Sequence, residues 1–379
     1  MASIKNLGTK SKPNWQFRVS YKVGGKYKTK SKQGFRTRKE AELAAAEMER
    51  RLNAGFDIDG GDQLFSEYMR NWYEIFRKGK KSQDNDNDIR RAVEFVEEYF
   101  AGVKLKELTR EMYQKALNDY GKTRSTAAVK KHHTSMRACL REALVDGLIV
   151  RDPTFNVVAK GKVESKDEKL KYLNYEEAKK LIQVTKERLN YRYISRFIIL
   201  FALATGARFS EIIGLTWDCV DFKEQTVTIN KTWDYKYTNN FSNTKNYASI
   251  RTITIDRETL SILRKLKLEQ DKRALKTGRR NKKNLVFVDQ NFEPVTNNAV
   301  NKTLRALCKK AGIKEVTCHA LRHTHASMLL YKKVNIKYIS RRLGHKDIVT
   351  TLQTYSHIMD EIEQKESREV DEMMSELYV

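Results

Sequence analysis

A histidine and an arginine three positions apart could together bind a phosphate group. His319 and Arg322 lie at i and i+3, so on a helix the imidazole and the guanidinium would be neighbours. An arginine fork binds two phosphate oxygens at once. Arg208 follows Gly206, which can end one helix, and the first turn of a helix beginning here would add partial positive charge. Glu211, at i+3 from Arg208, could orient that arginine, although the pair alone could also be an exposed ion pair of little energetic weight.

A metal site is the alternative for the histidines. His319 and His323 lie at i and i+4 and would share a helix face, but zinc would need further ligands and a base. The sequence contains no Walker motif, no GxGxxG, no HExxH and no DxDxDG pattern. We therefore expect neither a metal ion nor another cofactor.

Four sequence boxes occur in a fixed order along the second half of the chain. Residues 204–217 read Ala-Thr-Gly-Ala-Arg-Phe-Ser-Glu-Ile-Ile-Gly-Leu-Thr-Trp, residues 319–323 read His-Ala-Leu-Arg-His, residues 343–345 read Leu-Gly-His and residues 354–357 read Thr-Tyr-Ser-His. Together they resemble the boxes of the tyrosine recombinases, the phage integrase family. One box would be weak support, whereas four in register are specific.

The resemblance implies a set of catalytic residues. These are Arg208, Lys245, His319, Arg322, His345 and the nucleophile Tyr355, with Glu211 in support. The family's lysine lies on a β-hairpin and best matches Lys245, although Lys236 competes because the connection between Lys231 and Lys245 is long. We expect His323, His325 and His357 to be structural.

The resemblance also implies a mechanism without metal or ATP. The two arginines would neutralise the charge that develops on the phosphate. His319 and His345 would add hydrogen bonds or take the proton of Tyr355, whose hydroxyl has an ordinary pKa near ~10. Lys245 would protonate the departing 5′-oxygen, which leaves a 3′-phosphotyrosine ester that conserves the energy of the broken bond. Taken alone, Tyr355 would be interpreted as a partly buried helix tyrosine.

The N-terminal segment, residues 1–56, is predicted to form a small sheet and a helix. No acidic residue precedes Glu40. Apolar and polar residues alternate over Trp15–Val23, and Gly24-Gly25 follows, which predicts a β-hairpin. A short third strand is expected near Gly34-Phe35. Thr37 and Glu40 form a capping box for a helix over residues 38–53.

Helical spacing dominates the middle of the chain, from Gln63 to about Leu148, after a possible hinge at Gly60-Gly61. Four helices are expected, separated by breaks near residues 78–88, 101–102 and 121–125. Asp152-Pro153 should end this module, and residues 160–171 should form a charged linker.

The remaining part, from Tyr172 onward, should be mixed. Helices are predicted at residues 175–188, 195–204 and 209–215, strands at residues 226–233 and 250–255, and helices over the remainder. The fold class is thus multidomain and mainly α with small β-sheets (α+β). The resemblance assigns a three-stranded sheet plus helix that binds arm-type DNA sites (1–56), a helical core-binding domain (62–158) and a mixed α/β catalytic domain with an acidic tail helix (170–379).

A net charge of +26 points to a polyanionic partner, most often nucleic acid. An acidic membrane is the rival, but here the charge is spread over most of the chain rather than confined to one amphipathic segment. We expect the polar face of the N-terminal sheet to carry lysines and arginines into a DNA groove, although it could be merely solvated. The predicted DNA contacts are Lys22, Lys26, Lys28, Lys30, Arg36, Lys130, Lys131 and Arg137.

Several features bear on location and partners. No signal peptide is visible, the apolar run 197–207 is too short for a membrane span, and the four cysteines show no CxxC pairing, so a reducing bacterial cytoplasm is expected. Residues 358–379 are acidic, so this tail should avoid DNA and pack on protein. The resemblance implies double-stranded DNA with core and arm attachment sites, a homotetramer whose tails reach a neighbouring protomer, and as further partners an excision factor and a host DNA-bending protein.

The sequence therefore predicts a site-specific DNA recombinase, an integrase of a mobile element that acts in integration and excision. Two alternatives remain. A chromosome-dimer resolvase or a type IB topoisomerase would share the chemistry, but the basic N-terminal segment favours integration. A DNA-binding regulator with an inactive recombinase core would lack it.

Overall fold

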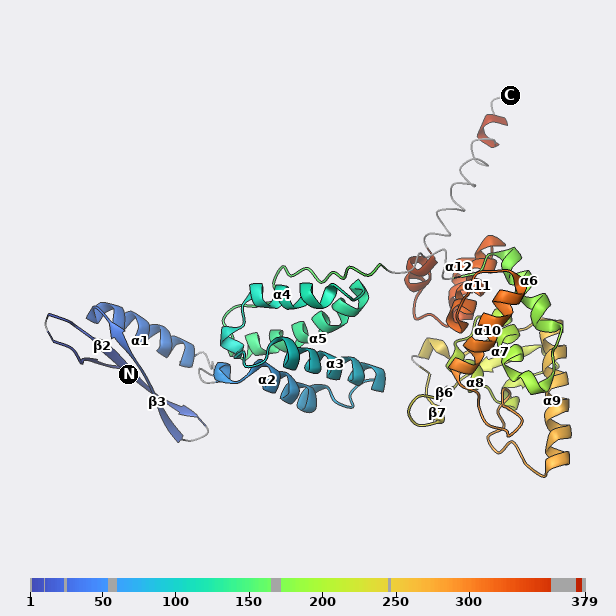
Figure 1. Ribbon diagram of the computed structural model, residues 1–379, viewed down its shortest axis with the longest axis horizontal. Helices are drawn as coiled ribbons and strands as arrows, with labels where there is room; N and C mark the ends of the chain where they lie inside the picture. Colours follow the sequence, from blue (N-terminus) through green and yellow to red (C-terminus); the bar gives the residue numbers. More distant parts are fainter. Residues whose placement is uncertain are drawn as a thin grey trace. The chain divides into compact units, whose positions relative to one another are not determined.

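The computed structural model describes residues 2–9, 11–23, 26–53, 60–164, 172–244, 247–355 and 373–376. The chain divides into two compact units, residues 1–165 and 166–379, which are described separately (Figure 1). Helices dominate both units and the sheets are small, so the predicted fold class is confirmed. No helix in the described part of the chain is long and apolar enough to cross a membrane.

The first unit begins with an antiparallel sheet in the order β1-β2-β3 and a helix, α1, packed against it. Their bounds are Ser3–Asn6 (β1), Trp15–Val23 (β2), Lys26–Phe35 (β3) and Arg38–Asn53 (α1). The alternation in β2 turns Phe17 and Val19 toward α1, where both are buried with Ala45. The capping box is confirmed, because the Thr37 hydroxyl accepts from the Glu40 amide at 3.2 Å and the Glu40 carboxylate accepts from the Thr37 amide at 3.4 Å.

The predicted position of the third strand is wrong. Gly34 and Phe35 continue β3 past a register shift at Trp15/Gln16, and the third strand is β1 at the N-terminus. Within β1, Ile4 lies opposite Phe17, and a single inward apolar residue is too short a pattern to mark a strand in the sequence.

The middle of the first unit contains the four expected helices. They are α2 (Phe65–Trp72), which continues as a π-helical turn (Tyr73–Arg77), α3 (Gln83–Tyr99), α4 (Arg110–Gly121) and α5 (Thr126–Val145). The side chains of Ser82, Thr109 and Ser125 cap α3, α4 and α5 by accepting backbone hydrogen bonds. Gly61 packs closely, since a Cβ there would lie 2.5 Å from the carbonyl oxygen of Leu148.

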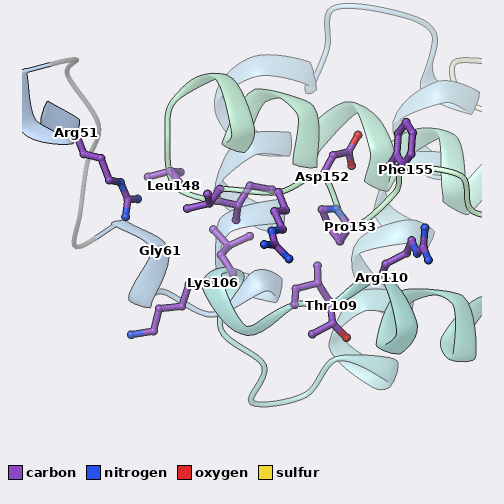
Figure 2. A pocket seen from close by; sticks show the side chains of 14 residues that line it. Arg51, Gly61, Lys106, Thr109, Arg110, Leu148, Asp152, Pro153 and Phe155 are labelled. Atoms are coloured by element: carbon purple, nitrogen blue, oxygen red, sulfur yellow. The ribbon is translucent and has the colours of Figure 1, made fainter. Parts of the chain in front are cut away.

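The helical module does not end at Asp152-Pro153. Figure 2 shows the chain leaving α5 beside a hollow whose lining includes Leu148, Asp152, Pro153 and Phe155. Beyond it, the Gln114 amide donates to the Val158 carbonyl and accepts from the Val158 amide, both at 2.9 Å. The Gly161 amide donates to Thr126 Oγ1 at 3.1 Å, and a Cβ on Gly161 would lie 2.2 Å from a backbone oxygen. The segment up to Val163 is therefore a strap bound to α4 and α5, and the part of the expected linker that is described belongs to the module.

The second unit contains helices around two small antiparallel sheets, β4-β5-β8 and β6-β7. Its helices are α6 (Tyr175–Lys186), α7 (Ile194–Thr205), α8 (Phe209–Ile213), α9 (Arg257–Thr277), α10 (Asn297–Ala311), α11 (Cys318–Tyr331) and α12 (Ile336–Leu343). Its strands are β4 (Val220–Asp221), β5 (Thr226–Ile229), β6 (Thr232–Asp234), β7 (Asn240–Ser242) and β8 (Arg251–Thr254). Short 3₁₀ turns span Gly60–Asp62 and Leu105–Glu107 in the first unit and Tyr191–Tyr193, Trp217–Cys219 and Tyr247–Ser249 in the second.

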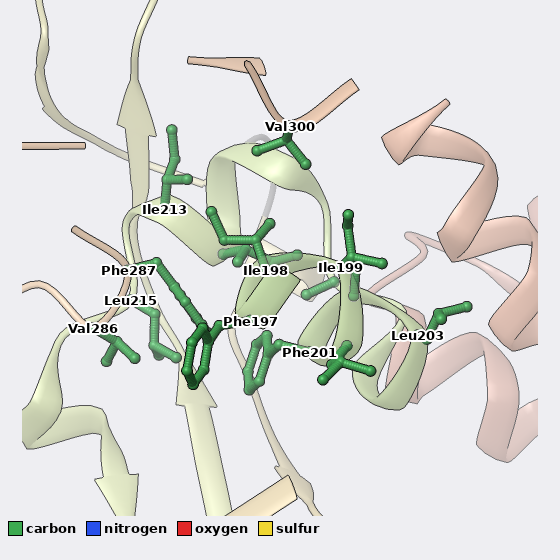
Figure 3. Packing of buried hydrophobic residues seen from close by; sticks show 14 of the residues in the cluster. Phe197, Ile198, Ile199, Phe201, Leu203, Ile213, Leu215, Val286, Phe287 and Val300 are labelled. Carbon is green, nitrogen blue, oxygen red and sulfur yellow. The ribbon is translucent and has the colours of Figure 1, made fainter. Parts of the chain in front are cut away.

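Helix α7 forms the centre of the second unit. It packs against α6, α9, α10 and α11, which explains why residues 197–204 are all apolar. Figure 3 shows Phe197, Ile198 and Phe201 of α7 packed with side chains from other segments, including Ile213 and Phe287. This buried helix carries the start of the first sequence box to the centre of the domain.

Two predictions for the second unit need correction. The single strand expected over residues 226–233 is split, because β5 pairs with β8 whereas β6 pairs with β7. The stretch after α9 is not wholly helical, since bridges join Thr216 to Leu285 and Val288 to Pro294. Residues 285–288 are all buried, and so short an apolar run has no period that separates strand from helix.

Candidate active site

Arg322 lies on α11 and is 3% exposed. Its Nη1 donates to the carbonyl of Gly206 at 2.8 Å and its Nη2 to the carbonyl of Leu343 at 2.7 Å. The guanidinium therefore joins the C-terminal ends of α7 and α12. Burial and the nearby Arg208 lower its pKa to about 9, so Arg322 remains a cation at neutral pH.

Arg208 is the N-cap residue of α8 rather than a member of its first turn. Its Nη1 donates to Glu211 Oε1 at 2.7 Å, and its backbone amide donates to Glu211 Oε2 at 2.9 Å. The Glu211 side chain is 1% exposed and that of Arg208 is 27% exposed. Since the Glu211 carboxylate is buried, the ion pair between Arg208 and Glu211 is not the exposed surface pair considered from the sequence.

Two further arginines surround this site and were missed in the sequence. Arg251 of β8 donates from Nη2 to Glu211 Oε2 at 2.9 Å. Arg342 of α12 donates from Nη2 to the Ala204 carbonyl at 3.1 Å. Burial would raise the pKa of Glu211, but the guanidinium groups of Arg251 and Arg208 hold that pKa below its usual value. Nothing in the spacing marks either arginine, because contacts between β8, α8 and α12 depend on the tertiary fold.

His345 follows α12 immediately after Gly344, which ends the helix at φ 70°. Its Nδ1 lies 2.7 Å from Thr351 Oγ1. Burial, with the positive charges of Arg322 and Arg208, lowers the pKa of His345 to about 4. His319 is subject to the same influences, since burial, Arg322 and Arg208 lower its pKa. Both imidazoles are therefore neutral at pH 7 and can donate or accept hydrogen bonds.

Tyr355 is 1% exposed and packs with Ala326, Leu330, Ile339 and Leu343. Its ring lies 5.6 Å from the ring of His323, which in turn lies 5.0 Å from the ring of His319. Within the described part of the chain, the buried Tyr355 hydroxyl has no hydrogen-bond partner. Burial raises its pKa to about 12, although Arg322 and Arg208 oppose this rise.

His325 is structural, as predicted. Its Nδ1 lies 2.7 Å from the Leu203 carbonyl, which can only accept, so Nδ1 carries the proton. Its Nε2 lies 3.1 Å from Arg342 Nε, which can only donate, so Nε2 is the acceptor. Burial and Arg342 lower the pKa of His325 to about 3.

We expect the second unit to lose stability as the pH falls below 6.5. The unfolded chain binds a proton at each histidine near its ordinary pKa, whereas folded His325 stays neutral down to about 3. This group alone contributes a slope that approaches about 1.4 kcal/mol per pH unit in that window. Glu211 also stabilises the folded state, but this stabilisation is lost only at pH values below the usual carboxylate pKa, because its pKa in the folded state is lower still. Denaturant unfolding between pH 7 and 4.5 should show a shallower pH dependence in His325→Gln than in the wild type, and equal slopes would contradict the assignment.

Part of the predicted site falls outside the described residues. The predicted residues concerned are Lys245, His357 and the acidic tail except for residues 373–376. The competing lysine, Lys236, follows β6 in an exposed turn where its backbone amide donates to Asp234 Oδ1 at 3.1 Å.

The lysines predicted to line the polar face of the N-terminal sheet do not all lie on one face. Lys22 pairs with Tyr27 on the face away from α1, whereas Lys28 pairs with Tyr21 and Lys30 with Val19 on the face that α1 covers in part. Lysines at alternate positions of β3 share a face with each other but not with Lys22. The side chain of Lys26 lies outside the described part.

The other predicted DNA contacts occupy exposed positions. Arg36 is exposed at the start of the turn before α1, and Lys130 and Arg137 are exposed on α5. Lys131 donates to Asp88 at 2.9 Å and so already has a carboxylate partner.

No group of three or more His, Cys, Asp or Glu side chains in the described ranges could hold a metal ion. The alternative of a zinc site at His319 and His323 therefore has no further ligand there. Arg208 and Arg251 both pair with the buried Glu211, and the buried cation Arg322 interacts with all three through their charges. Neutral histidines and the buried Tyr355 complete the arrangement. Such a cluster suits an anion with several oxygens.

Comparison with known families identifies the chain. The profile described as the phage integrase family matches residues 171–361, half of the sequence. The chain belongs to the phage integrase family. A second profile, described as an arm DNA-binding domain, matches residues 3–52 of this family member.

Curated relatives agree with the family. A tyrosine recombinase XerC-like protein of Caldanaerobacter subterraneus is 25% identical over 96% of each chain. The integrase of Staphylococcus phage L54a is 26% identical and covers 82% of this chain and 92% of its own. The resemblance seen in the four boxes is thus confirmed, and this phage integrase family member is a tyrosine site-specific recombinase.

Solved structures share its fold. The Tn1549 transposon integrase, solved in complex with transposon right end DNA, aligns with a TM-score of 0.66 and 19% identity over 81% of this chain and 99% of its own. A lambda integrase tetramer bound to a Holliday junction aligns with a TM-score of 0.56 and 18% identity over 86% of this chain and 89% of its own.

Proposed function

We propose that this recombinase integrates and excises a mobile genetic element by cutting DNA with Tyr355 and rejoining it without metal or ATP. The observation that carries the proposal is the convergence of Tyr355, Arg322 and Arg208. The two arginines are close enough to Tyr355 to oppose the rise in its pKa. The match to an arm DNA-binding profile at residues 3–52 supports an integrase rather than a resolvase.

The arginines would bind the non-bridging oxygens of the scissile phosphate. Arg322 is held by two backbone carbonyls, and Glu211 holds Arg208, so neither guanidinium has to reorganise when charge develops. Each donates through only part of its fork to these partners, which leaves other N–H groups for the phosphate.

Tyr355 would attack the phosphorus while its proton passes to a neutral acceptor. With a pKa of about 12, the hydroxyl is protonated at pH 7 and needs a base as it attacks. His319 and His345 are the assigned proton acceptors or hydrogen-bond donors, and both are neutral because burial and the arginines lower their pKa values. Lys245 is the proposed acid that protonates the departing 5′-oxygen.

The resulting bond joins the tyrosine oxygen to the 3′-phosphate, and the 5′-oxygen leaves as a hydroxyl. Attack by the 5′-hydroxyl of another strand on this ester releases Tyr355 and reseals the backbone. One phosphoester replaces another at each step, so no external energy source is required.

The domain boundaries and partners belong to this proposal. Residues 1–56 would bind arm sites, residues 62–158 the core site, and residues 170–379 would carry out catalysis. Strand exchange would take place in a homotetramer on double-stranded DNA in the bacterial cytoplasm, with the acidic tail packing on a neighbouring protomer. An excision factor and a host DNA-bending protein would set the direction.

Covalent trapping tests the proposal. The full chain is incubated in EDTA with labelled DNA from the flanks of its gene, and with duplexes nicked near the crossover, and is then quenched in SDS. We expect a protein–DNA adduct, with the nucleotide attached to the peptide that contains Tyr355 in a mass-spectrometric digest. Attachment at another residue would overturn the role of Tyr355, and tight binding with no adduct on any nicked duplex would favour the inactive regulator.

A further inference from the structure

Arg251 lies at the start of β8 and is almost wholly buried, with a side chain that is 6% exposed. Each of its three nitrogens donates to a different segment of the second unit. Nη2 donates to Glu211 Oε2 at 2.9 Å, Nε donates to the Arg342 carbonyl at 2.6 Å, and Nη1 donates to the Ser249 carbonyl at 2.8 Å. One side chain thus connects α8, the end of α12 and the turn before β8.

The contact with Glu211 acts on Arg208. Glu211 uses Oε1 for the Arg208 guanidinium and Oε2 for both Arg251 and the Arg208 backbone amide. Without Arg251, the carboxylate loses its second cation, and only the Arg208 backbone amide still holds its second oxygen. The direction in which Arg208 presents its fork therefore depends on Arg251, although Arg251 is not one of the residues that the proposed reaction uses.

The contact with the end of α12 acts on His345. The Arg342 carbonyl that receives Arg251 Nε lies two residues before Gly344, and a Cβ on Gly344 would lie 2.8 Å from Arg251 Nη1. Arg251 thus packs directly against the backbone that turns into His345. The same buried cation contributes to lowering the pKa of His345.

We propose that Arg251 is a positioning residue for DNA cleavage, which fixes Arg208 through Glu211 and His345 through the backbone at Gly344. This inference rests on the proposed function. The geometry requires arginine, because a lysine has the charge but only one nitrogen and cannot reach three acceptors in three directions.

The test compares three variants of the full chain on a nicked core-site duplex, measuring single-turnover cleavage and DNA affinity at fixed salt. Arg251→Gln removes charge and geometry, and Arg251→Lys keeps the charge. Arg264→Gln is the matched control, because Arg264 is an exposed arginine that donates to the Phe222 carbonyl at 3.2 Å. We expect Arg251→Gln to slow cleavage by about 10- to 100-fold with affinity within about threefold of wild type, and Arg264→Gln to be unchanged.

The pH profile separates positioning from a general loss of folding. Removing the cation should move the acidic limb of the cleavage rate to higher pH in Arg251→Gln. Arg251→Lys should restore that limb while the rate at its plateau stays low. A reduced rate with an unshifted limb in both variants would overturn the proposed link to His345.

A double-mutant cycle tests the route through Glu211. If Arg251 acts through that carboxylate, the double variant Glu211→Gln/Arg251→Gln should cleave at least about fivefold faster than the product of the two single effects predicts. Effects that multiply would overturn the proposed route. If the wild type itself forms no adduct, the proposed function fails. If the wild type is active and Arg251→Gln cleaves at the same rate, only the inference about Arg251 is refuted.

Discussion

Replacing Tyr355 by phenylalanine is expected to abolish the covalent adduct while DNA binding and folding stay intact. The hydroxyl has no hydrogen-bond partner among the described residues, so its removal breaks no contact described there and leaves the packed ring in place. Loss of a nucleophile typically costs about 10⁴-fold or more in rate. SDS-quenched adduct formation and DNA affinity, measured side by side, check this prediction.

Tyr338→Phe is the matched control for that experiment. Tyr338 lies on α12 in the same unit but is 43% exposed, and losing its hydroxyl should leave adduct formation unchanged. An adduct in Tyr355→Phe that equals the wild type would assign the nucleophile to another residue. A loss of DNA affinity equal to the loss of cleavage would mean that Tyr355 supports binding rather than chemistry.

Replacing Gly206 by alanine is expected to destabilise the second unit by about 2–5 kcal/mol. Gly206 has φ +66°, and a Cβ there would lie 2.7 Å from the His325 ring and 2.8 Å from Leu343 Cδ2. Both neighbours are buried, so neither can move aside freely. The Gly206 carbonyl also accepts from Arg322, so cleavage should fall as well.

Gly278→Ala supplies the comparison. Gly278 ends α9 at φ +69° but has no atom within 4 Å of the added Cβ, so only the backbone penalty of about 1 kcal/mol remains. Hydrogen exchange of the α7 amides measures both variants in the full chain. Similar losses in the two would show that the contact with His325 and Leu343 does not restrict position 206.

The sequence predicted the helices of this protein well where caps and periodicity agree. Thr37 with Glu40 marks the start of α1, and Gly206 marks the end of α7 at the predicted place. Prediction from the sequence failed where an element is short or depends on the strand with which it pairs, as for β1, β5 and β6. Those strands are specified by contacts with distant segments, which leave no period in so few residues.

The site was predicted from the residue types in the four boxes, whereas the hydrogen bonds and ion pairs that hold these residues were not predicted. The boxes drew attention to Arg208, Arg322 and Tyr355, and in the structure both arginines lie close enough to Tyr355 to affect its pKa. Arg251 and Arg342 were overlooked because an arginine that donates to backbone carbonyls resembles a surface arginine in the sequence. The helical spacing around Tyr355 predicted partial burial, but its nearly complete burial depends on α11 and α12 together.

The arginine cluster around Glu211 carries a consequence for the lifetime of the free protein. Arg208 and Arg251 share the buried Glu211 carboxylate, and both also act on the buried cation Arg322. Three positive charges thus face one negative charge in a region where burial strengthens the repulsion between like charges. A DNA phosphate bound there, as proposed, would add negative charge, so we expect the occupied unit to unfold less often than the empty one. Proteases act on the unfolded fraction, so we expect limited proteolysis of the second unit to be slower with a core-site duplex than without it; equal rates would contradict this consequence.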